Sequence, residues 1–557
     1  MRLFCILGCM LAISSWGGRR ALAEDSFIPA DQAQSRFVDL ARRIDTGAIA
    51  ALPVQNNGRI KPLDSLAREA IVFMTGKYGM WGLSPLQIYL GLMLDESSSS
   101  VPLIEVRDPE LRRDLGLAAG RRFFSAVELQ TTDLENQAAP LSKKEESNSK
   151  SLSSKESKIL ETYRELMLSR AVAAGNHFFT ALDFSSRTDM QHGAETGTIQ
   201  QAAERYLRAL SAADREQARM SARELIELVN AYPLPDILKP YRDTVKIEVF
   251  YNQARLFLIA AIAYLLIAIL ILIPQTRAYL GRNGVLGLLA IPVSIHALGF
   301  GLRVYISRFA PVTNMYGTML WVSFGVALFS AVLYFFYRQA IVVGLLLVAS
   351  ASVLLLTHNL PLILSPDMDP IVAVLRSNFW LTTHVLTITI SYAAFTVAMV
   401  LGNTGLVANL IGVRDAGFYK RYAHFTYRMI QLGVFLISAG IILGGIWADY
   451  SWGRFWGWDP KETWALIADL GFLMILHARY VGWLRDFGLL ASSAAAYLLV
   501  IMAWYGVNFV LAAGLHSYGF SSGGATFVAI FVSTQVALLA ASLLIRRYTA
   551  KISAVTM

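Results

Sequence analysis

The chain has 557 residues, of which 55% are hydrophobic and 16% are charged, and its mean hydropathy is +0.47. Soluble proteins carry about 25% charged residues, so this composition excludes an ordinary soluble enzyme. The apolar blocks are too long for the alternating strands of an outer-membrane barrel. We therefore expect an all-α polytopic membrane protein, and we attribute the net charge of +9 to cytoplasmic helix ends rather than to nucleic-acid binding.

Residues 1–23 have the form of a secretory signal peptide, with a basic start, an apolar run and the small-residue sequence Ala21-Leu22-Ala23. Two arginines just before that site are atypical, so an uncleaved anchor is the alternative. The only cysteines, Cys5 and Cys9, lie in this segment. Cleavage would leave no disulfide, no thiolate metal site and no Cys-x-x-Cys-His for covalent haem attachment.

Residues 24–250 are polar and predict a mainly helical extracytoplasmic region, since no apolar run there is long enough to span a membrane. The Ser/Lys/Glu-rich stretch 141–158 predicts a disordered linker. The stretch 53–68, PVQNNGRIKPLDSLAR, predicts a loop that leads into a helix, with a turn at Asn57-Gly58.

Residues 251–557 predict the transmembrane domain, because a bilayer core about 30 Å thick needs about 20 apolar residues per helix. About nine spans are expected, at 256–273, 284–305, 316–337, 340–357, 380–411, 429–448, 463–482, 487–511 and 525–545.

The basic residues between these spans predict the orientation of the chain. One side holds twelve of them: Arg277, Arg282, Arg338, Arg414, Lys420, Arg421, Arg428, Arg479, Arg485, Arg546, Arg547 and Lys551. The other side holds five: Arg303, Arg308, Arg376, Arg454 and Lys461. The first side is therefore predicted to be cytoplasmic, and residues 24–250 to be outside, as a signal peptide also requires.

The connection between the sixth and seventh spans is rich in aromatic residues. Its five tryptophans are Trp447, Trp452, Trp456, Trp458 and Trp464, and its glycines include Gly453 and Gly457. An interfacial aromatic belt needs only one or two tryptophans per helix end, so this loop favours a shelf for a large planar ligand. At its end, Asp459, Pro460 and Glu462 fit the N-cap, N1 and N3 positions of a capping box, so part of the signal is structural.

Three histidines are candidate haem-iron ligands, because neutral imidazole commonly binds haem iron. His384 starts the fifth span and His516 follows the eighth, both on the predicted outer side. His477 lies in the inner half of the seventh span, where an ionisable residue is costly. His296 lies within the second span, and a hydrogen bond between helices would explain it equally well.

The segment WGRFWGWDPKETWALI resembles the tryptophan-rich signature (WWD motif) of the haem-handling proteins, in the version of the CcsA (ResC) family of System II cytochrome c synthases. The stretch 369–392, DPIVAVLRSNFWLTTHVLTITISY, is similar to the family's segment around its first outer histidine, here His384. The resemblance covers about residues 250–550. It implies that His384 and His516 hold haem iron at an outer site and that His477 is an intramembrane ligand.

The resemblance further implies the haem-handling subunit of a cytochrome c haem lyase in the inner membrane. Haem b would be substrate and bound ligand, carried to the outer face and presented for thioether attachment to apocytochrome c. Its cofactor-binding residues would be the three histidines with Trp452, Gly453, Trp456, Gly457, Trp458, Asp459, Pro460, Glu462 and Trp464. No catalytic residue is assigned beyond these, and Lys461 and Arg454 are candidates to meet the haem propionates.

Partners implied are a CcsB (ResB)-like membrane protein, apocytochrome c and extracytoplasmic thiol-reducing proteins. In fused forms of the synthase the CcsB half supplies a second intramembrane histidine, which has no obvious counterpart here unless His296 replaces it. Two other functions stay open. A secondary transporter should show internal repeats, and none is seen. A b-type electron-transfer subunit would need histidine pairs on facing helices inside the bilayer.

Overall fold

The computed structural model describes residues 30–147, 152–184, 193–310, 312–370, 379–511 and 524–555. Its contacts divide the chain into two compact units. The N-terminal unit comprises residues up to Ala254 together with two short segments, Tyr305–Ser307 and Asp367–Pro370. The membrane unit comprises the rest. The predicted signal peptide, residues 1–23, lies outside the described residues.

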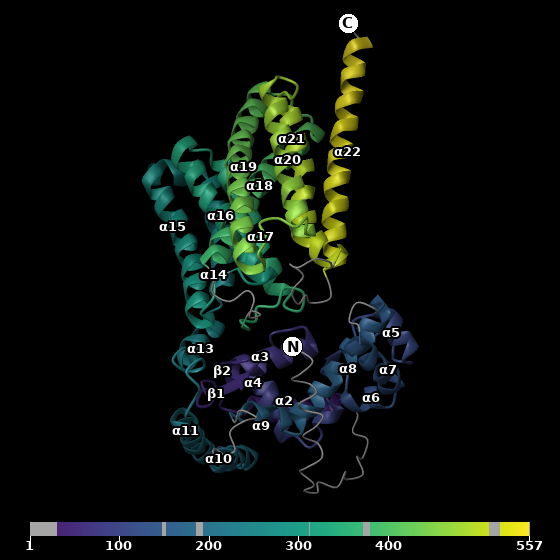
Figure 1. The fold of residues 1–557 in the computed structure, drawn as a ribbon, viewed down its shortest axis with the longest axis vertical. Helices are drawn as coiled ribbons and strands as arrows, with labels where there is room; N and C mark the ends of the chain where they lie inside the picture. The colour runs from purple at the N-terminus through teal and green to yellow at the C-terminus, as the bar shows by residue number, and fades with distance from the viewer. Residues whose placement is uncertain are drawn as a thin grey trace. The chain divides into compact units, whose positions relative to one another are not determined.

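The N-terminal unit is mainly helical, as expected, with two small antiparallel sheets (Figure 1). Its longer elements are α2 (Ala30–Arg42), β1 (Pro53–Asn56), β2 (Arg59–Pro62), α3 (Leu63–Thr75), α4 (Pro85–Leu94), α7 (Leu134–Ser147), α8 (Ser154–Ala173), α10 (Gly193–Ser211), α11 (Arg215–Ala231) and α13 (Val245–Ala254). Its short elements are η2 (Ser98–Ser100), β3 (Ile104–Glu105), α5 (Pro109–Asp114), β4 (Phe123–Phe124), α6 (Ala126–Gln130), α9 (Asn176–Ala181) and α12 (Lys239–Arg242).

The stretch 53–68 forms a β-hairpin that runs directly into helix α3, rather than a loop. Asn57 and Gly58 link β1 to β2, and both have positive φ, 49° and 77°. Two-residue turns of this kind match the twist of paired strands and favour Asn-Gly. The turn expected at Asn57-Gly58 is therefore present, but it closes a hairpin.

Most of the stretch 141–158 is helical, which differs from the disordered linker expected there. Helix α7 continues to Ser147, and α8 begins at Ser154 with a capping box between Ser153 and Glu156. Lys144 also pairs with Glu156 at 2.7 Å. Composition alone predicts a solvated chain, but the cap and the ion pair favour helix on both sides of the four residues left undescribed.

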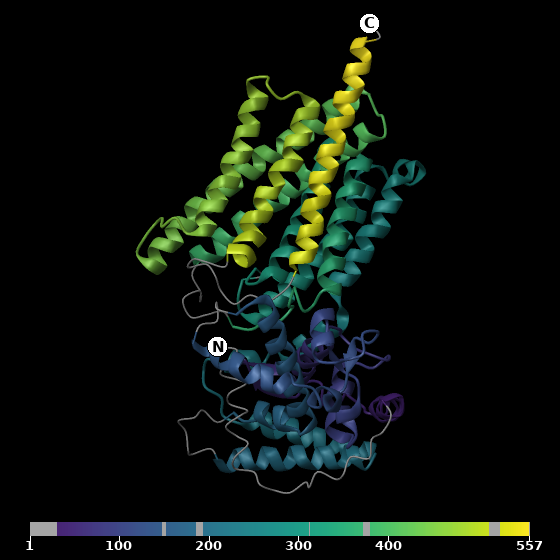
Figure 2. The ribbon, with the colours of Figure 1, turned by 90° about the vertical axis from the view of Figure 1, so that its right-hand side faces the viewer.

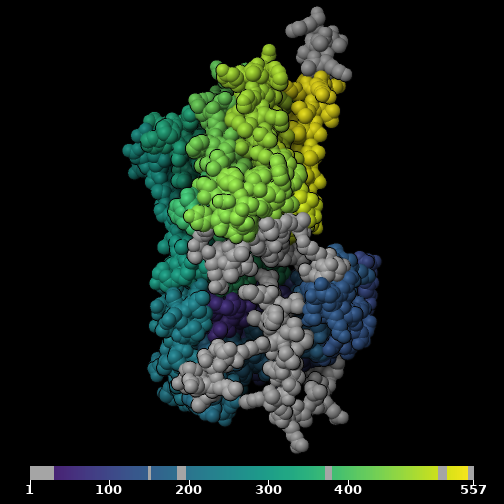
Figure 3. Space-filling view, viewed as in Figure 1, coloured from purple at the N-terminus to yellow at the C-terminus, as the bar shows by residue number. Residues whose placement is uncertain are grey.

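The membrane unit consists of long helices that run side by side (Figure 2). They are α14 (Leu256–Leu272), α15 (Pro274–Ser307, kinked at Gly281), α16 (Met315–Tyr337), α17 (Ala340–Asn359), α18 (Phe379–Leu410), α19 (Ala416–Trp452), α20 (Pro460–Tyr480), α21 (Asp486–Ile501), the π-helix η6 (Met502–Leu511) and α22 (Ala525–Val555). The core lies among α16–α21, and α22 lies along one edge of this bundle (Figure 3).

Among the described residues, eight helices are long and apolar enough to cross a membrane, so the protein is an all-α, multi-pass membrane protein. The seventh predicted span, 463–482, corresponds to α20, whose 21 residues are too polar to count with these eight helices. Helix α20 packs against α19, α21 and η6. Its buried Asp469 accepts a hydrogen bond from Ser438 of α19 at 2.8 Å, so this polar group faces protein.

Candidate functional site

His384 lies near the start of α18 and packs against α19. Its ring stacks on that of Trp447, with centroids 5.8 Å apart and an interplanar angle of 13°. Trp447 is only 1% exposed, so it forms a rigid support for the imidazole. The structure thus brings one predicted ligand together with the first tryptophan of the shelf.

Glycines of α19 let α18 approach closely enough for this contact. Gly433, Gly440 and Gly444 face Phe395, Ile388 and His384 in that order. A Cβ added at Gly444 would lie 2.9 Å from the Nδ1 atom of His384, and one at Gly440 would lie 3.0 Å from the backbone nitrogen of Ile388. Small residues permit close helix packing in membranes, so this glycine face sets where His384 sits.

The remaining aromatic residues of the shelf surround the end of α19. Trp452 meets Trp447 edge to face, with centroids 4.7 Å apart, and Trp456 meets Trp458 in the same way at 5.7 Å. Trp458 is 70% exposed and has a positive φ of 56°. The shelf therefore combines a buried base with an exposed aromatic face of the kind that a flat apolar ligand needs.

The acidic residues of the motif organise the loop. Asp459 caps α20 by accepting from the backbone N–H of Lys461 at 3.0 Å. Glu462 accepts from the N–H groups of Gly457 (2.8 Å) and Asp459 (3.1 Å) and pairs with Arg454 at 3.2 Å. The expected capping box is confirmed. Both carboxylates therefore hold the shape of the loop.

The other shelf positions follow from the same fold. Gly453 ends α19 in the left-handed region, with φ 66°, and Pro460 occupies the first turn of α20. Gly457 leaves room for the Arg454 guanidinium, which a Cβ there would meet at 1.7 Å. Trp464 lies in the first turns of α20 and is partly exposed. The Arg454 guanidinium lies over the Trp452 ring, 5.6 Å from its centroid, as well as beside Glu462.

His477 lies far from the shelf on the same helix. Seventeen residues separate it from Pro460, which corresponds to about 25 Å along an α-helix. Its Nδ1 bonds the carbonyl of Leu473 at 2.8 Å, and because a carbonyl only accepts, Nδ1 carries the proton. The side chain is exposed on the bundle surface.

His296 is fully buried among aromatic rings, unlike His477. Its Nδ1 lies 3.2 Å from the Tyr264 hydroxyl, and its ring stacks on Phe300 with centroids 5.4 Å apart. Phe257 and Phe324 approach it edge-on at 5.4 and 5.3 Å. This packing leaves no open face for a porphyrin, so His296 fits the helix-to-helix hydrogen bond that was the alternative reading.

The second predicted outer ligand, His516, lies outside the described residues. The π-helix η6 ends five residues before it, at Leu511.

The sequence analysis did not single out the glycines of α19. Gly433, Gly440 and Gly444 are spaced by seven and four residues, which places them on one face of a helix, and this spacing could have identified them.

Comparison with known proteins places these residues in one family. Residues 312–516, which include His384, the shelf, His477 and His516, match the model of the cytochrome c assembly protein family. The chain is 32% identical over 255 residues to the cytochrome c biogenesis protein CcsA of Prochlorococcus marinus, covering 40% of this chain and 80% of that protein. It is 31% identical over 269 residues to CcsA of Chlamydomonas reinhardtii, covering 43% and 74%.

A longer match reaches beyond the membrane unit. The chain is 30% identical over 495 residues to protein NrfI of Wolinella succinogenes, covering 83% of this chain and 53% of NrfI. Because residues 251–557 make up little more than half of the chain, this match extends into the N-terminal region. The chain spans about half the length of NrfI. On these comparisons, the chain belongs to the CcsA family of cytochrome c biogenesis proteins.

Proposed function

We propose that this protein is the haem-handling subunit of a cytochrome c synthase (haem lyase), which moves haem b to the outer face of the membrane and presents it to apocytochrome c. The observation that carries the proposal is the packing of the His384 imidazole. Its imidazole lies against the buried Trp447, at the base of an exposed aromatic shelf, within the segment that matches the cytochrome c assembly family.

In this function His384 and His516 bind the haem iron, and the tryptophans Trp452, Trp456 and Trp458 contact the porphyrin face. The histidine of a Cys-x-x-Cys-His segment then replaces one axial ligand. Each thioether bond forms when a cysteine S–H adds across a haem vinyl C=C, the hydrogen passing to the vinyl carbon. The thiols must be reduced, which calls for extracytoplasmic thiol-reducing partners. This protein orients the haem, and the bond-forming chemistry belongs to haem and substrate.

The proposed function requires the shelf to be on the extracytoplasmic side of the inner membrane. The count of twelve basic residues against five supports that orientation, with residues 24–250 also outside. Lys461 and Arg454 are the proposed contacts of the haem propionates, and Arg454 also pairs with Glu462 and lies over the Trp452 ring.

We also propose a CcsB (ResB)-like partner protein that completes the intramembrane site. His477 is exposed, while His296 is enclosed by aromatic rings. The second ligand for iron at His477 is proposed to come from this partner rather than from His296.

The first test replaces the outer ligands. His384→Ala or His516→Ala should lower the haem bound per protein by about tenfold or more and reduce cytochrome c maturation, and added imidazole should partly restore both. His424→Ala is the matched control, because His424 lies elsewhere and contacts Tyr337. If both variants keep wild-type haem spectra and full maturation, the assignment is wrong. Electron transfer without cytochrome c maturation would instead indicate a b-type electron-transfer subunit. Solute transport by a protein that binds no haem would indicate a secondary transporter.

The second test concerns the intramembrane site. His477→Ala should reduce haem at the outer site when haem is supplied from inside, whereas haem supplied from outside should still bind there. The protein should co-purify with a CcsB-like protein, and His296→Ala should mature cytochrome c normally. A chain that matures cytochrome c alone, and that fails when His296 is replaced, would overturn the proposed division.

A further inference from the structure

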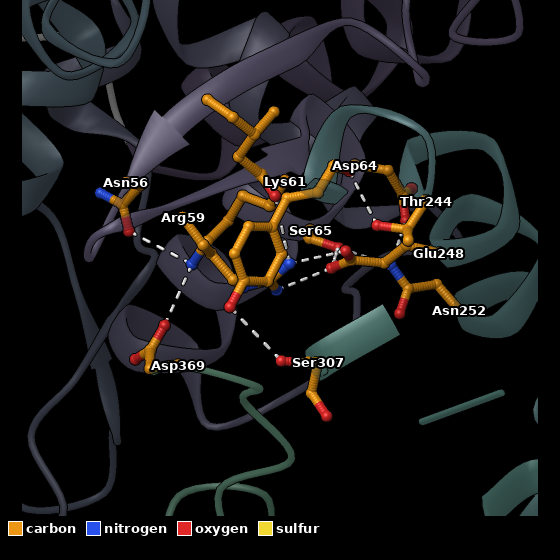
Figure 4. A network of polar contacts seen from close by, with 12 residues as sticks. Asn56, Arg59, Lys61, Asp64, Ser65, Thr244, Glu248, Asn252, Ser307 and Asp369 are labelled. Carbon is orange, nitrogen blue, oxygen red and sulfur yellow. Dashed lines mark hydrogen bonds and ion pairs between the residues drawn. The ribbon is translucent and has the colours of Figure 1, made fainter. Parts of the chain in front are cut away.

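Two buried cations of the N-terminal unit are paired within that unit (Figure 4). Arg59, which is 1% exposed, donates to both carboxylate oxygens of Glu248, at 2.7 and 2.8 Å. Lys61, which is 0% exposed, donates to Glu69 at 2.7 and 2.8 Å and to Asp369 at 3.3 Å. Burial of a charge is costly unless the charge is paired, and these contacts satisfy both cations. The proposed haem ligand lies in the membrane unit, and its position depends on the helices packed around it there.

The helix that carries His384 is only partly buried where it begins. Helix α18 starts at Phe379, and its first buried residue is Thr389. The side chains of residues 379–388 are therefore all at least partly exposed. Segments with little buried surface open more easily than the core, so each contact with a neighbouring helix matters for the position of the imidazole.

One such contact comes from helix α16. The indole N–H of Trp321 donates to the backbone carbonyl of Leu386, two residues after His384, with a nitrogen–oxygen distance of 3.4 Å. A carbonyl oxygen has two lone pairs, so it can accept from the indole as well as from its own helix. Trp321 lies six residues after the first residue of α16, and Leu386 lies seven residues after the first residue of α18. The hydrogen bond therefore joins the second turns of the two helices.

A hydrogen bond to the backbone restrains α18 itself rather than one of its side chains. It limits both the rotation of the helix about its axis and its shift along α16. Side-chain directions on a helix follow from these two quantities, so the bond at Leu386 also restrains the direction of the His384 side chain.

Trp321 is itself held by aromatic neighbours in the membrane unit. Its ring stacks on that of Phe324 in the same helix, with centroids 5.7 Å apart and an interplanar angle of 27°. Phe300 of α15 meets it edge to face, at 5.5 Å and 84°. Such ring pairs favour a defined geometry, so the indole N–H is presented to α18 from a fixed position.

Helices α16 and α19 hold the start of α18 by similar means on two different faces. On α16, Gly325 lies four residues after Trp321, and a Cβ added there would lie 2.6 Å from the side chain of Ile390. On α19, the glycine and tryptophan are Gly444 and Trp447. In each helix the glycine permits a close approach of α18, and the tryptophan makes a directed contact with it.

We propose that Trp321 is a positioning residue for the outer haem site: its hydrogen bond to the α18 backbone keeps His384 against Trp447, in the position from which the imidazole binds haem iron. This inference rests on the proposed haem-binding role of His384. It adds a residue of α16 to a site whose other proposed residues lie in α18, in the segment that follows η6 and in the connection from α19 to α20.

Trp321→Phe tests the proposal, because phenylalanine keeps an aromatic ring beside Phe324 and Phe300 but has no N–H donor. In haem-free protein, hydrogen exchange of residues 380–390 should become about fivefold faster, as expected for the net loss of one hydrogen bond. The affinity of the outer site for haem should fall by a similar factor. At limiting haem the six-coordinate spectrum should weaken, and added imidazole should restore it.

A second variant separates the hydrogen bond from the size of the ring. Benzothienylalanine at position 321 has nearly the shape of tryptophan, with sulfur in place of the indole N–H. It should reproduce the faster exchange and the weaker haem binding. Wild-type behaviour of this variant would show that the hydrogen bond does not position His384.

Ser323→Ala is the matched control, because it also removes an interhelical hydrogen bond of α16, the 2.8 Å contact between Ser323 and Ser350 of α17. It should leave the exchange of residues 380–390 and the haem affinity unchanged, and equal losses in this variant would overturn the proposal. Wild-type haem affinity in Trp321→Phe, with or without faster exchange, would overturn it as well. If His384→Ala also keeps its haem, the proposed function fails; if only Trp321→Phe keeps it, this inference alone fails.

Discussion

At the scale of single residues, the position of His384 depends on the absence of a side chain at Gly444 of α19. Gly444 leaves the space that the imidazole occupies, and Trp447, three residues further on, supports the ring from one face. Residues three or four positions apart on a helix lie on the same side, so one face of α19 both admits and orients the histidine.

Gly444→Ala should displace the imidazole of His384. The added Cβ would lie 2.9 Å from Nδ1, and overpacking of this kind costs about 1–3 kcal/mol. We expect weaker haem binding with little change in the amount of protein in the membrane, measured by haem titration of the purified protein. Gly287→Ala is the control, because a Cβ at that helical position would meet nothing within 4 Å. Equal haem affinity in the two variants would contradict the prediction.

At the scale of elements, the carboxylates of Asp459 and Glu462 hold the connection from α19 to α20, and Glu462 makes the larger number of these contacts. Glu462 bonds two backbone N–H groups and pairs with Arg454, and so it closes the loop that carries Trp452, Trp456 and Trp458. The arrangement of the shelf tryptophans therefore depends on the contacts that Glu462 makes. The Asp-Pro-x-Glu pattern in the sequence corresponds to the capped start of helix α20.

Glu462→Ala should loosen the shelf, because two backbone donors lose their acceptor at a cost of about 1–3 kcal/mol each. We expect faster hydrogen exchange across residues 452–462 and weaker haem binding. Glu462→Gln keeps an oxygen that can accept from the N–H groups of Gly457 and Asp459 and loses only the ion pair with Arg454, so it should lie close to wild type. An Ala variant with unchanged exchange would show that the cap does not hold the loop.

At the scale of the whole molecule, the proposed function depends on sidedness. Cysteine labelling tests it in a chain whose Cys5 and Cys9 are replaced by serine. Ser147→Cys and Ser451→Cys should react with an impermeant thiol reagent in intact cells, whereas Ala416→Cys should react only after the membrane is permeabilised. Ser147 and Ala416 are exposed and Ser451 is partly exposed, so access should follow from sidedness. Labelling of Ala416→Cys in intact cells would show that the orientation is the reverse of the predicted one.

Several features could be predicted from the sequence because they depend on residues close together in the chain. Apolar blocks of about 20 residues define membrane helices, and the capping box at Asp459 and Glu462 spans only four positions. The Asn57-Gly58 turn is equally local. The stretch 141–158 is more helical than the predicted linker. Its composition alone does not reveal the capping box at Ser153 or the ion pair between Lys144 and Glu156.

The sequence by itself determined the class of the protein, its family resemblance and the residue types of the candidate haem site. Only the tertiary structure decided that His384 stacks on Trp447, that His296 is enclosed by aromatic rings, and that Lys61 meets Asp369. The physical reason is sequence separation: 308 positions divide Lys61 from Asp369, and only the fold brings their charges within 3.3 Å of each other.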